Sequence, residues 1–183
     1  MSQVFGLAYI DLVCRHHRSC LVCGGLESDP GAFMKRTLNC KDFLDFRGEH
    51  SPGIIDFFRR LSDGETGLIG IFIAPTESVM VLQLTSPQFG LSAKTIALID
   101  FVVILKTSKI IQAIAEPMAV DPEANDIIFN YPYHRGRFDE LIWSGRSLIL
   151  EKIAEELELP VQKLIKTINR DSQLRGSAVR KIW

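Results

Sequence analysis

Short runs of apolar residues alternate with polar turns through the first two thirds of the chain, and this pattern is typical of β-strands. Most runs are rich in β-branched and aromatic side chains and end at residues that favour turns. The run at 67–74 is apolar at nearly every position, which indicates a central strand buried on both faces. We therefore predict strands at residues 4–13, 20–26, 67–74, 78–85, 109–115 and 126–131.

One apolar segment, residues 94–105, fits two types of element. Because it is almost wholly apolar, its periodicity does not distinguish a buried strand from a buried helix. A helix is predicted more clearly at residues 54–61. Ser51 is a suitable N-cap there, Pro52 occupies the first helical position, and Gly64 marks the end.

Beyond residue 133 the strand pattern gives way to helical spacing. Helices are predicted at residues 138–143 and 148–158, and Ser147 is placed to cap the second. A third helical pattern begins at Val161. These helices follow the loop at 131–136, which is the best candidate for a boundary along the chain.

The predicted elements define an α+β fold. It consists of a mainly antiparallel sheet with a covering helix, followed by a helical C-terminal segment that resembles a helix-turn-helix. The body spans residues 1–133 and the helical segment spans residues 134–183. The segment either forms a separate unit or packs on the body as part of one domain.

A helix-turn-helix needs an apolar face on each helix, a small residue where the helices cross, and a tight turn. The small residue is Ala154, and the turn position that usually carries a left-handed glycine is Glu158. A left-handed backbone costs about 1–2 kcal/mol for a residue with a side chain. The two apolar faces consist of Ile153, Leu157 and Leu159 and of Leu164 and Ile168.

The second helix of this pattern and the segment after it are strongly basic. Between residues 161 and 183 there are six basic residues and one acidic residue, Asp171, for a net charge of +5. Lys and Arg side chains reach phosphates, and Gln and Asn side chains reach base edges. This pattern predicts contact with DNA or RNA through Gln162, Lys163, Lys166, Asn169, Arg170, Arg175, Arg180 and Lys181.

Other interpretations of the same segment need no nucleic acid. A helical hairpin packed on the sheet would leave its charged faces solvated, and helix-turn-helix geometry also occurs in proteins that bind no DNA. The formal net charge of the whole chain is −1, so any attraction to a polyanion has to come from a local patch. An apolar fraction of 46% favours burial of surface against another chain. The alternative function is therefore a structural or adaptor subunit of a homo-oligomer or a larger protein assembly.

Cysteines and histidines cluster near the start of the chain. Cys20 and Cys23 have the spacing of a zinc knuckle, and Cys14 with His17 is one choice for the second ligand pair. Cys40 with His50 is the other choice. The cluster predicts a structural zinc ion. If the segment around Cys20 is instead an extended strand, Cys20 and Cys23 point to opposite faces and cannot share a metal.

The common catalytic motifs are absent from the sequence, which has no Gly-x4-Gly-Lys-Ser/Thr, Gly-x-Gly-x-x-Gly, Gly-x-Ser-x-Gly or His-Glu-x-x-His. The remaining candidate is the loop at 131–146, where tyrosines, a histidine, arginines and acids lie close together. Such residues suit an anion or carboxylate pocket. A small enzyme that uses this loop is the second alternative, although the sequence favours a protein that is not an enzyme.

The sequence also indicates the cellular compartment in which the protein is expected. The densest apolar run, 96–105, is too short for a membrane span and contains Asp100. The first residues lack a positive region and include Asp11, which is unlike a signal peptide. A cytoplasmic protein with reduced cysteines and no membrane partner is therefore expected.

Overall fold

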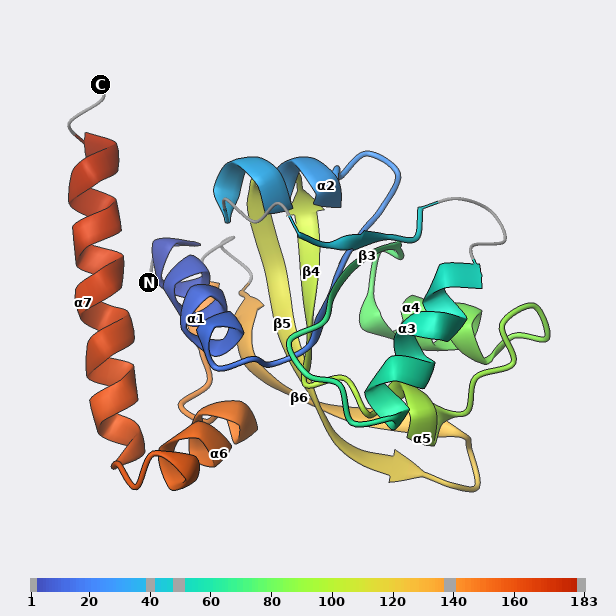
Figure 1. Cartoon of the computed structure of the whole chain (residues 1–183). Helices are drawn as coiled ribbons and strands as arrows, with labels where there is room; N and C mark the ends of the chain where they lie inside the picture. Colours follow the sequence, from blue (N-terminus) through green and yellow to red (C-terminus); the bar gives the residue numbers. More distant parts are fainter. Residues whose placement is uncertain (1–2, 39–41, 48–51, 137–140, 181–183) are drawn as a thin grey trace.

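The computed structural model describes residues 3–38, 42–47, 52–136 and 141–180. Within them a seven-stranded mixed sheet lies between two groups of helices (Figure 1). The short element η1 is a π-helix. In chain order the elements are α1 (Gln3–Arg15), β1 (Cys20–Gly24), α2 (Pro30–Ala32), η1 (Phe33–Thr37), β2 (Leu44–Asp45), α3 (Pro52–Ser62), β3 (Ile69–Ile73), α4 (Glu77–Thr85), α5 (Ala93–Ile96), β4 (Phe101–Thr107), β5 (Ile110–Asp121), β6 (Asp126–Arg135), β7 (Leu141–Trp143), α6 (Leu148–Glu156) and α7 (Val161–Arg180).

The strands are arranged in the order β2-β3-β1-β4-β5-β6-β7. The pairings from β2 to β4 are parallel, and those from β4 to β7 are antiparallel. The prediction of a mainly antiparallel sheet therefore holds for one half of the sheet only. Every residue of β1 is buried, as expected of a strand with parallel neighbours and helices over both faces.

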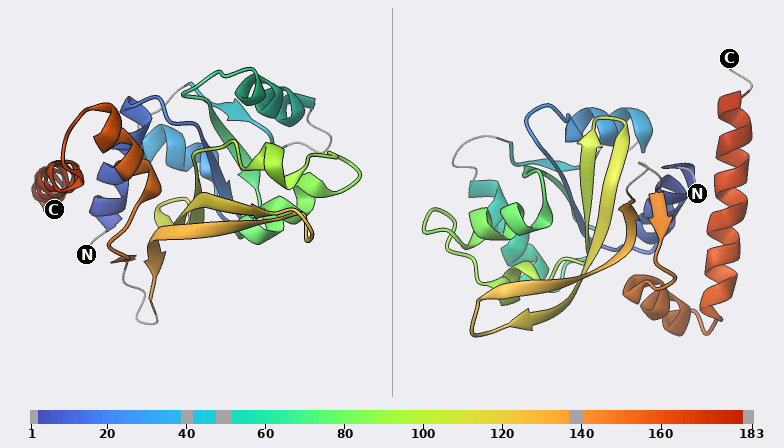
Figure 2. Two further views of the ribbon diagram at one scale, coloured as in Figure 1. Left: turned by 90° about the horizontal axis from the view of Figure 1, so that it is seen from below. Right: turned by 180° about the vertical axis from the view of Figure 1, so that it is seen from behind.

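Each face of the sheet carries its own hydrophobic core. Residues of α1, η1, α6 and α7 pack over one face, and residues of α3, α4 and α5 pack over the other. Seen from below and from behind, α7 lies on the side of α1 that is turned away from the sheet (Figure 2). The protein is thus a layered mixed α/β structure with an additional helix, α7, outside one layer.

The prediction of a strand at residues 4–13 is wrong, because these residues belong to helix α1. The buried residues Phe5, Ala8, Tyr9 and Leu12 follow the spacing of one helix face. Since α1 lies between the sheet and α7, residues on its other sides are buried as well. This burial makes the segment apolar at nearly every position and hides its helical period.

Two further elements differ from the prediction. Residues 78–85 lie in helix α4 instead of a strand, and Thr76 Oγ1 caps this helix by accepting a hydrogen bond from Val79 N at 3.2 Å. Residues 141–143 form strand β7 and pair with β6, whereas the sequence predicts a helix at 138–143. Residues 138–140 of that predicted helix lie outside the described residues.

Several predictions are confirmed. Strands β1, β3, β5 and β6 occur at the predicted places, and α3 ends before Gly64, whose φ is +87°. The ambiguous segment at 94–105 contains parts of both α5 and β4. Between them, Asp100 Oδ2 accepts a hydrogen bond from Ser19 N at 2.7 Å. Ser51, the predicted cap of α3, lies outside the described residues.

The segment after residue 133 packs on the rest of the protein. Strand β6 runs continuously through the predicted boundary. Leu164 and Ile168 of α7 belong to the same core cluster as residues of α1 and β1. Among the described helices, none has the combination of length and apolar character that a membrane span requires.

Candidate functional site

Helices α6 and α7 meet at a short turn, where the sequence predicts a helix-turn-helix. Ser147 caps α6, because its Oγ accepts a hydrogen bond from Leu150 N at 3.1 Å. Glu158 in the turn has a φ of +53°, the left-handed conformation expected at that position. From this turn α7 runs along the outer side of α1 (Figure 1).

One face of α7 is committed to contact with α1. Leu164 and Ile168 are buried in the core cluster that includes α1. Arg15 of α1 adds ion pairs beside this contact: its Nη2 lies 2.8 Å from Asp11 Oδ2 and 3.4 Å from Asp171 Oδ2. This face of α7 is therefore unavailable to a partner.

The opposite face of α7 carries the predicted nucleic-acid contacts. The exposed ones are Gln162, Lys163, Lys166, Asn169 and Arg170. The Nε atom of Arg170 lies 3.6 Å from Asp171 Oδ1, a pairing too long and too exposed to cancel its charge. The side chains of Arg175 and Arg180, together with Lys181, lie outside the described residues.

Helix α6 and the turn present exposed acidic residues next to this basic face. Two of them pair with neighbouring arginines: Arg146 Nε lies 3.0 Å from Glu151 Oε1, and Arg18 Nη2 lies 2.5 Å from Glu156 Oε2. Glu155 and Glu158 are exposed as well, and no ion pair is found for them among the described residues.

The exposed surface of α6 and α7 therefore carries both signs of charge. Between residues 148 and 174 the chain has four basic and five acidic residues. We refer to Glu155, Glu158, Lys163 and Lys166 as the two-signed surface. Leu157, which is 42% exposed, lies between Glu155 and Glu158 along the chain.

A buried carboxylate anchors the start of α6 to the body. Glu116 of β5 is 1% exposed. Its Oε1 accepts hydrogen bonds from Tyr9 Oη at 2.5 Å and Ser147 Oγ at 2.6 Å. Its Oε2 accepts from Leu148 N at 2.7 Å and Asn130 Nδ2 at 3.0 Å. Burial, followed by the nearby Glu116 carboxylate, raises the pKa of Tyr9 well above its ordinary value, so Tyr9 remains a proton donor.

The predicted zinc ligands Cys14, His17, Cys20 and Cys23 are not brought together. Cys20 and Cys23 belong to the core clusters on opposite faces of the sheet, because β1 is an extended strand. Cys23 Sγ contacts Met80 Sδ at 3.7 Å, and burial raises the pKa of the Cys23 thiol. Across the described ranges no three His, Cys, Asp or Glu side chains are grouped as metal ligands. Cys40 and His50 lie outside those ranges.

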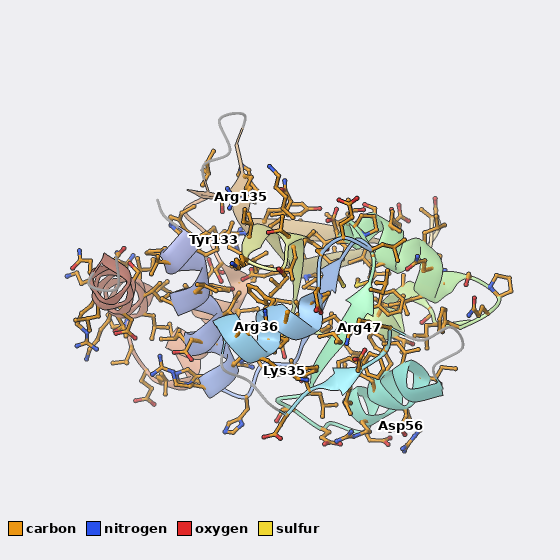
Figure 3. All side chains as sticks on the ribbon, turned by 90° about the horizontal axis from the view of Figure 1, so that it is seen from above. Lys35, Arg36, Arg47, Asp56, Tyr133 and Arg135 are labelled. Atoms are coloured by element: carbon orange, nitrogen blue, oxygen red, sulfur yellow. The ribbon has the colours of Figure 1, made fainter. Side chains whose placement is uncertain are left out.

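The loop predicted as an enzyme site, 131–146, spreads its side chains over both faces of the sheet. Tyr131 packs against the core beneath α4 and donates a hydrogen bond to Glu77 Oε1 at 2.8 Å. Tyr133 is buried in the opposite core, beside α1. Tyr133 and Arg135 both lie on the α1 side of the protein, away from Arg47 (Figure 3). The described side chains of this loop therefore do not converge on one place, and Arg137, Asp139 and Glu140 lie outside the described residues.

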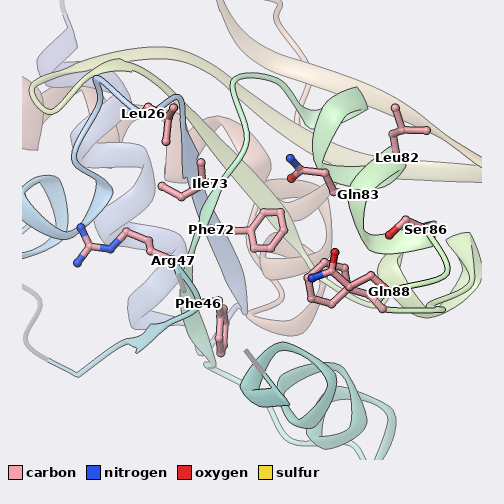
Figure 4. A pocket seen from close by; sticks show the side chains of 10 residues that line it. Leu26, Phe46, Arg47, Phe72, Ile73, Leu82, Gln83, Ser86 and Gln88 are labelled. Carbon is pink, nitrogen blue, oxygen red and sulfur yellow. The ribbon is translucent and has the colours of Figure 1, made fainter. Parts of the chain in front are cut away.

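A pocket of about 620 Å³ opens at the carboxyl ends of the parallel strands β1, β2 and β3 (Figure 4). Phe46, Phe72 and Phe89 contribute aromatic surface, and α4 contributes Leu82 and Gln83. No sequence motif marks this pocket. Its lining residues come from segments far apart in the chain, and only the parallel arrangement of the strands brings these segments together.

Arg47 lies at the edge of this pocket and is held by two carboxylates. Its Nη2 lies 2.6 Å from Asp45 Oδ2, and its Nη1 lies 2.9 Å from Asp29 Oδ1. Asp29 also caps α2, because its Oδ1 accepts a hydrogen bond from Ala32 N at 3.0 Å. The hydrogen bonds from Arg47 lower the pKa of Asp45.

The substitution Asp45→Asn is expected to make stability less sensitive to acid. The folded-state pKa of Asp45 is lowered from the unfolded value of about 3.9. The carboxylate therefore stabilises the fold above the unfolded pKa, and this contribution disappears as pH falls through the folded pKa. Urea unfolding at neutral pH and below pH ~4 measures the difference. The exposed control Glu123→Gln should behave like the wild type; an unchanged pH response in Asp45→Asn would contradict the assignment.

None of the protein-family models scanned matches this chain, and the curated proteins searched contain no match to it either. The class of the protein is accordingly defined by its fold: a mixed α/β domain with a seven-stranded sheet and helices on both faces. Function has to be inferred from the exposed surface of α6 and α7 and from the pocket.

Proposed function

We propose that the protein is a subunit of a homo-oligomer and that it self-associates through the two-signed surface of α6 and α7. The observation that carries this proposal is the exposure of acidic and basic residues side by side on one helical pair. A partner for such a surface needs both signs of charge in the reverse order. A second copy of the same chain supplies them.

Two-fold symmetry makes this match specific. In an interface between two identical chains related by a two-fold axis, residue i of one copy contacts residue j of the other, and the reverse also holds. Glu155 and Glu158 of one copy would then face Lys163 and Lys166 of the other. Leu157, between Glu155 and Glu158, would add apolar contact within the acidic part of this surface, since the cores of interfaces are depleted in charged residues.

Nucleic-acid binding is the second candidate function. The observation in its favour is the exposure of Gln162, Lys163, Lys166, Asn169 and Arg170 on the face of α7 opposite to α1. The acidic residues of α6 and the turn weigh against it, because they would repel a phosphate backbone that approaches the start of α7. We therefore place self-association first.

A charge-swap experiment distinguishes the two functions. Variant A carries Lys163→Glu and Lys166→Glu, and variant B carries Glu155→Lys and Glu158→Lys. Each variant alone should lose self-association by roughly 100-fold or more, since like charges facing each other across an interface cost several kcal/mol. A mixture of A and B should recover the dimer, because each acidic surface then faces a basic one. Sedimentation equilibrium over a range of protein concentrations measures all three samples.

Nucleic-acid binding gives a different result for the same variants. Variant A would lose retention on immobilised DNA, variant B would gain it, and mixing A with B would restore nothing. The matched control is Lys94→Glu with Lys109→Glu, which makes the same change in charge at exposed lysines elsewhere. A wild-type protein that is monomeric at all concentrations, or a mixture that stays monomeric, would overturn self-association through this surface.

A further inference from the structure

The pocket at the carboxyl ends of β1, β2 and β3 lies where ligands bind in open sheets with parallel strands. Leu26 follows β1, Arg47 follows β2, and Ile73 ends β3, and all three line the pocket. In such sheets the loops after neighbouring strands diverge and leave a crevice. A volume of about 620 Å³ is within the range of sites that enclose small organic molecules.

The lining of this pocket favours a flat apolar molecule. Phe72 and Phe89 stand edge to face with their ring centroids 6.3 Å apart, and Phe46 adds a third ring. At the rim, Leu26 is 92% exposed and Leu82 is 70% exposed. Because both leucine side chains are exposed to water, a ligand that covers them gains binding free energy from the burial of apolar surface.

One polar atom in the lining lacks a partner. Gln83 Oε1 is buried, and the described part of the chain offers it no hydrogen-bond partner. The Gln83 side chain extends from α4 into the pocket, close to Phe72 (Figure 4). A buried acceptor without a donor is destabilising. A ligand that brings an N–H group into the pocket would remove this penalty once the Gln83 side chain turns its amide oxygen toward the ligand.

The charges at the edge of the pocket exclude a strongly anionic ligand. Arg47 is the cationic side chain in the lining, and its guanidinium is already bound by Asp45 and Asp29. With two carboxylates against one guanidinium, this edge does not attract a phosphate or a second carboxylate. An uncharged ligand fits the balance of charges.

We propose that this pocket binds an uncharged planar heteroaromatic molecule that donates an N–H hydrogen bond to Gln83 Oε1 while its ring packs among Phe46, Phe72 and Phe89. The proposal is independent of self-association, because α6 and α7 contribute no lining residue. Ligand binding in the pocket can therefore be disproved without affecting the proposal of self-association, and the reverse also holds.

A matched pair of probe molecules tests this assignment. Indole and benzofuran have nearly the same shape, but only indole carries an N–H donor. Indole should bind the full chain with a dissociation constant of about 1–10 mM, the range expected of so small a probe. Benzofuran should bind about 2- to 12-fold more weakly, because it lacks the hydrogen bond. Chemical-shift changes of backbone amides in titrations of the labelled protein give both affinities and the place of binding.

Two variants locate the effect. Gln83→Leu keeps the size of the side chain and removes the acceptor, so it should bind the two probes equally well. Leu82→Glu places a carboxylate on the rim and should weaken both probes, whereas the control Leu98→Glu changes an exposed leucine outside the pocket and should weaken neither. Absence of binding by indole, equal binding of both probes to the wild type, or shifts confined to residues away from the pocket would each overturn the proposal.

Discussion

Replacing Glu116 with alanine is expected to lower the free energy of unfolding by about 3–5 kcal/mol, because several donors in a largely buried hydrogen-bond network lose their acceptor at once. The substitution leaves Tyr9, Ser147, Asn130 and the backbone of Leu148 without their shared acceptor. Each buried donor that loses its acceptor costs about 1–3 kcal/mol. Some of these donors will form a hydrogen bond with water instead, so the total is smaller than the sum of the four costs. Urea unfolding followed by circular dichroism measures the change.

Two controls separate the role of the carboxylate from a general effect of mutation. Glu123→Ala removes an exposed acid from the hairpin between β5 and β6, and it should change stability by no more than about 0.5 kcal/mol. Glu116→Gln keeps one acceptor oxygen in the network and should fall between the alanine variant and the wild type. A loss below about 1 kcal/mol for Glu116→Ala would show that the four hydrogen bonds do not hold α6 in place.

The second large effect is expected for Ile168→Ala on the inner face of α7. Ile168 is fully buried in the core cluster that also contains α1, so the substitution leaves a cavity between the two helices. Truncations of this kind cost about 2–5 kcal/mol. Urea unfolding measures the global change, and amide hydrogen exchange should show the greatest loss of protection along α7.

Leu174→Ala is the matched control for Ile168→Ala. It removes an aliphatic side chain from the same helix at a position that is 62% exposed. Its effect should stay near 0.5 kcal/mol. Equal losses for the two variants would mean that α7 does not pack on α1 through the face described above.

Local signals along the sequence predict where helices begin and end. They predict less well how the strands are arranged in the sheet. The type and position of Ser147 predict a helix cap, and the hydrogen bond that its Oγ accepts from Leu150 N confirms the start of α6. The helix-turn-helix pattern predicts a left-handed residue at Glu158, the turn position that usually carries glycine, and the φ of +53° at Glu158 agrees. Such features depend on a few adjacent residues and can be recognised from sequence.

Burial from two sides explains the largest error. Buried residues such as Phe5, Tyr9 and Leu12 have helical spacing, yet Ile10 and Val13 are buried as well. A helix that contacts the sheet on one side and α7 on the other has little polar face to reveal its period. The sequence alone does not show that a second helix will cover α1, so the apolar run predicts a strand.

The anchor and the pocket were missed for a related reason. Glu116 resembles any acidic residue that ends an apolar strand, and nothing near it in the sequence indicates that Tyr9 will be its partner. Their side chains meet only after β5 and α1 are placed by the sheet. The pocket likewise depends on parallel pairing of β1, β2 and β3, which periodicity does not reveal.

The contact between α1 and α7 joins parts of the chain made at very different times during synthesis. Arg15 and Asp171, which pair across it, are 156 positions apart. Until α7 has emerged from the ribosome, the outer side of α1 stays uncovered, so the nascent polypeptide carries an exposed apolar helix through most of translation. Contacts of such long range close slowly, and a chaperone that shields apolar helices would have its longest opportunity to bind during this interval.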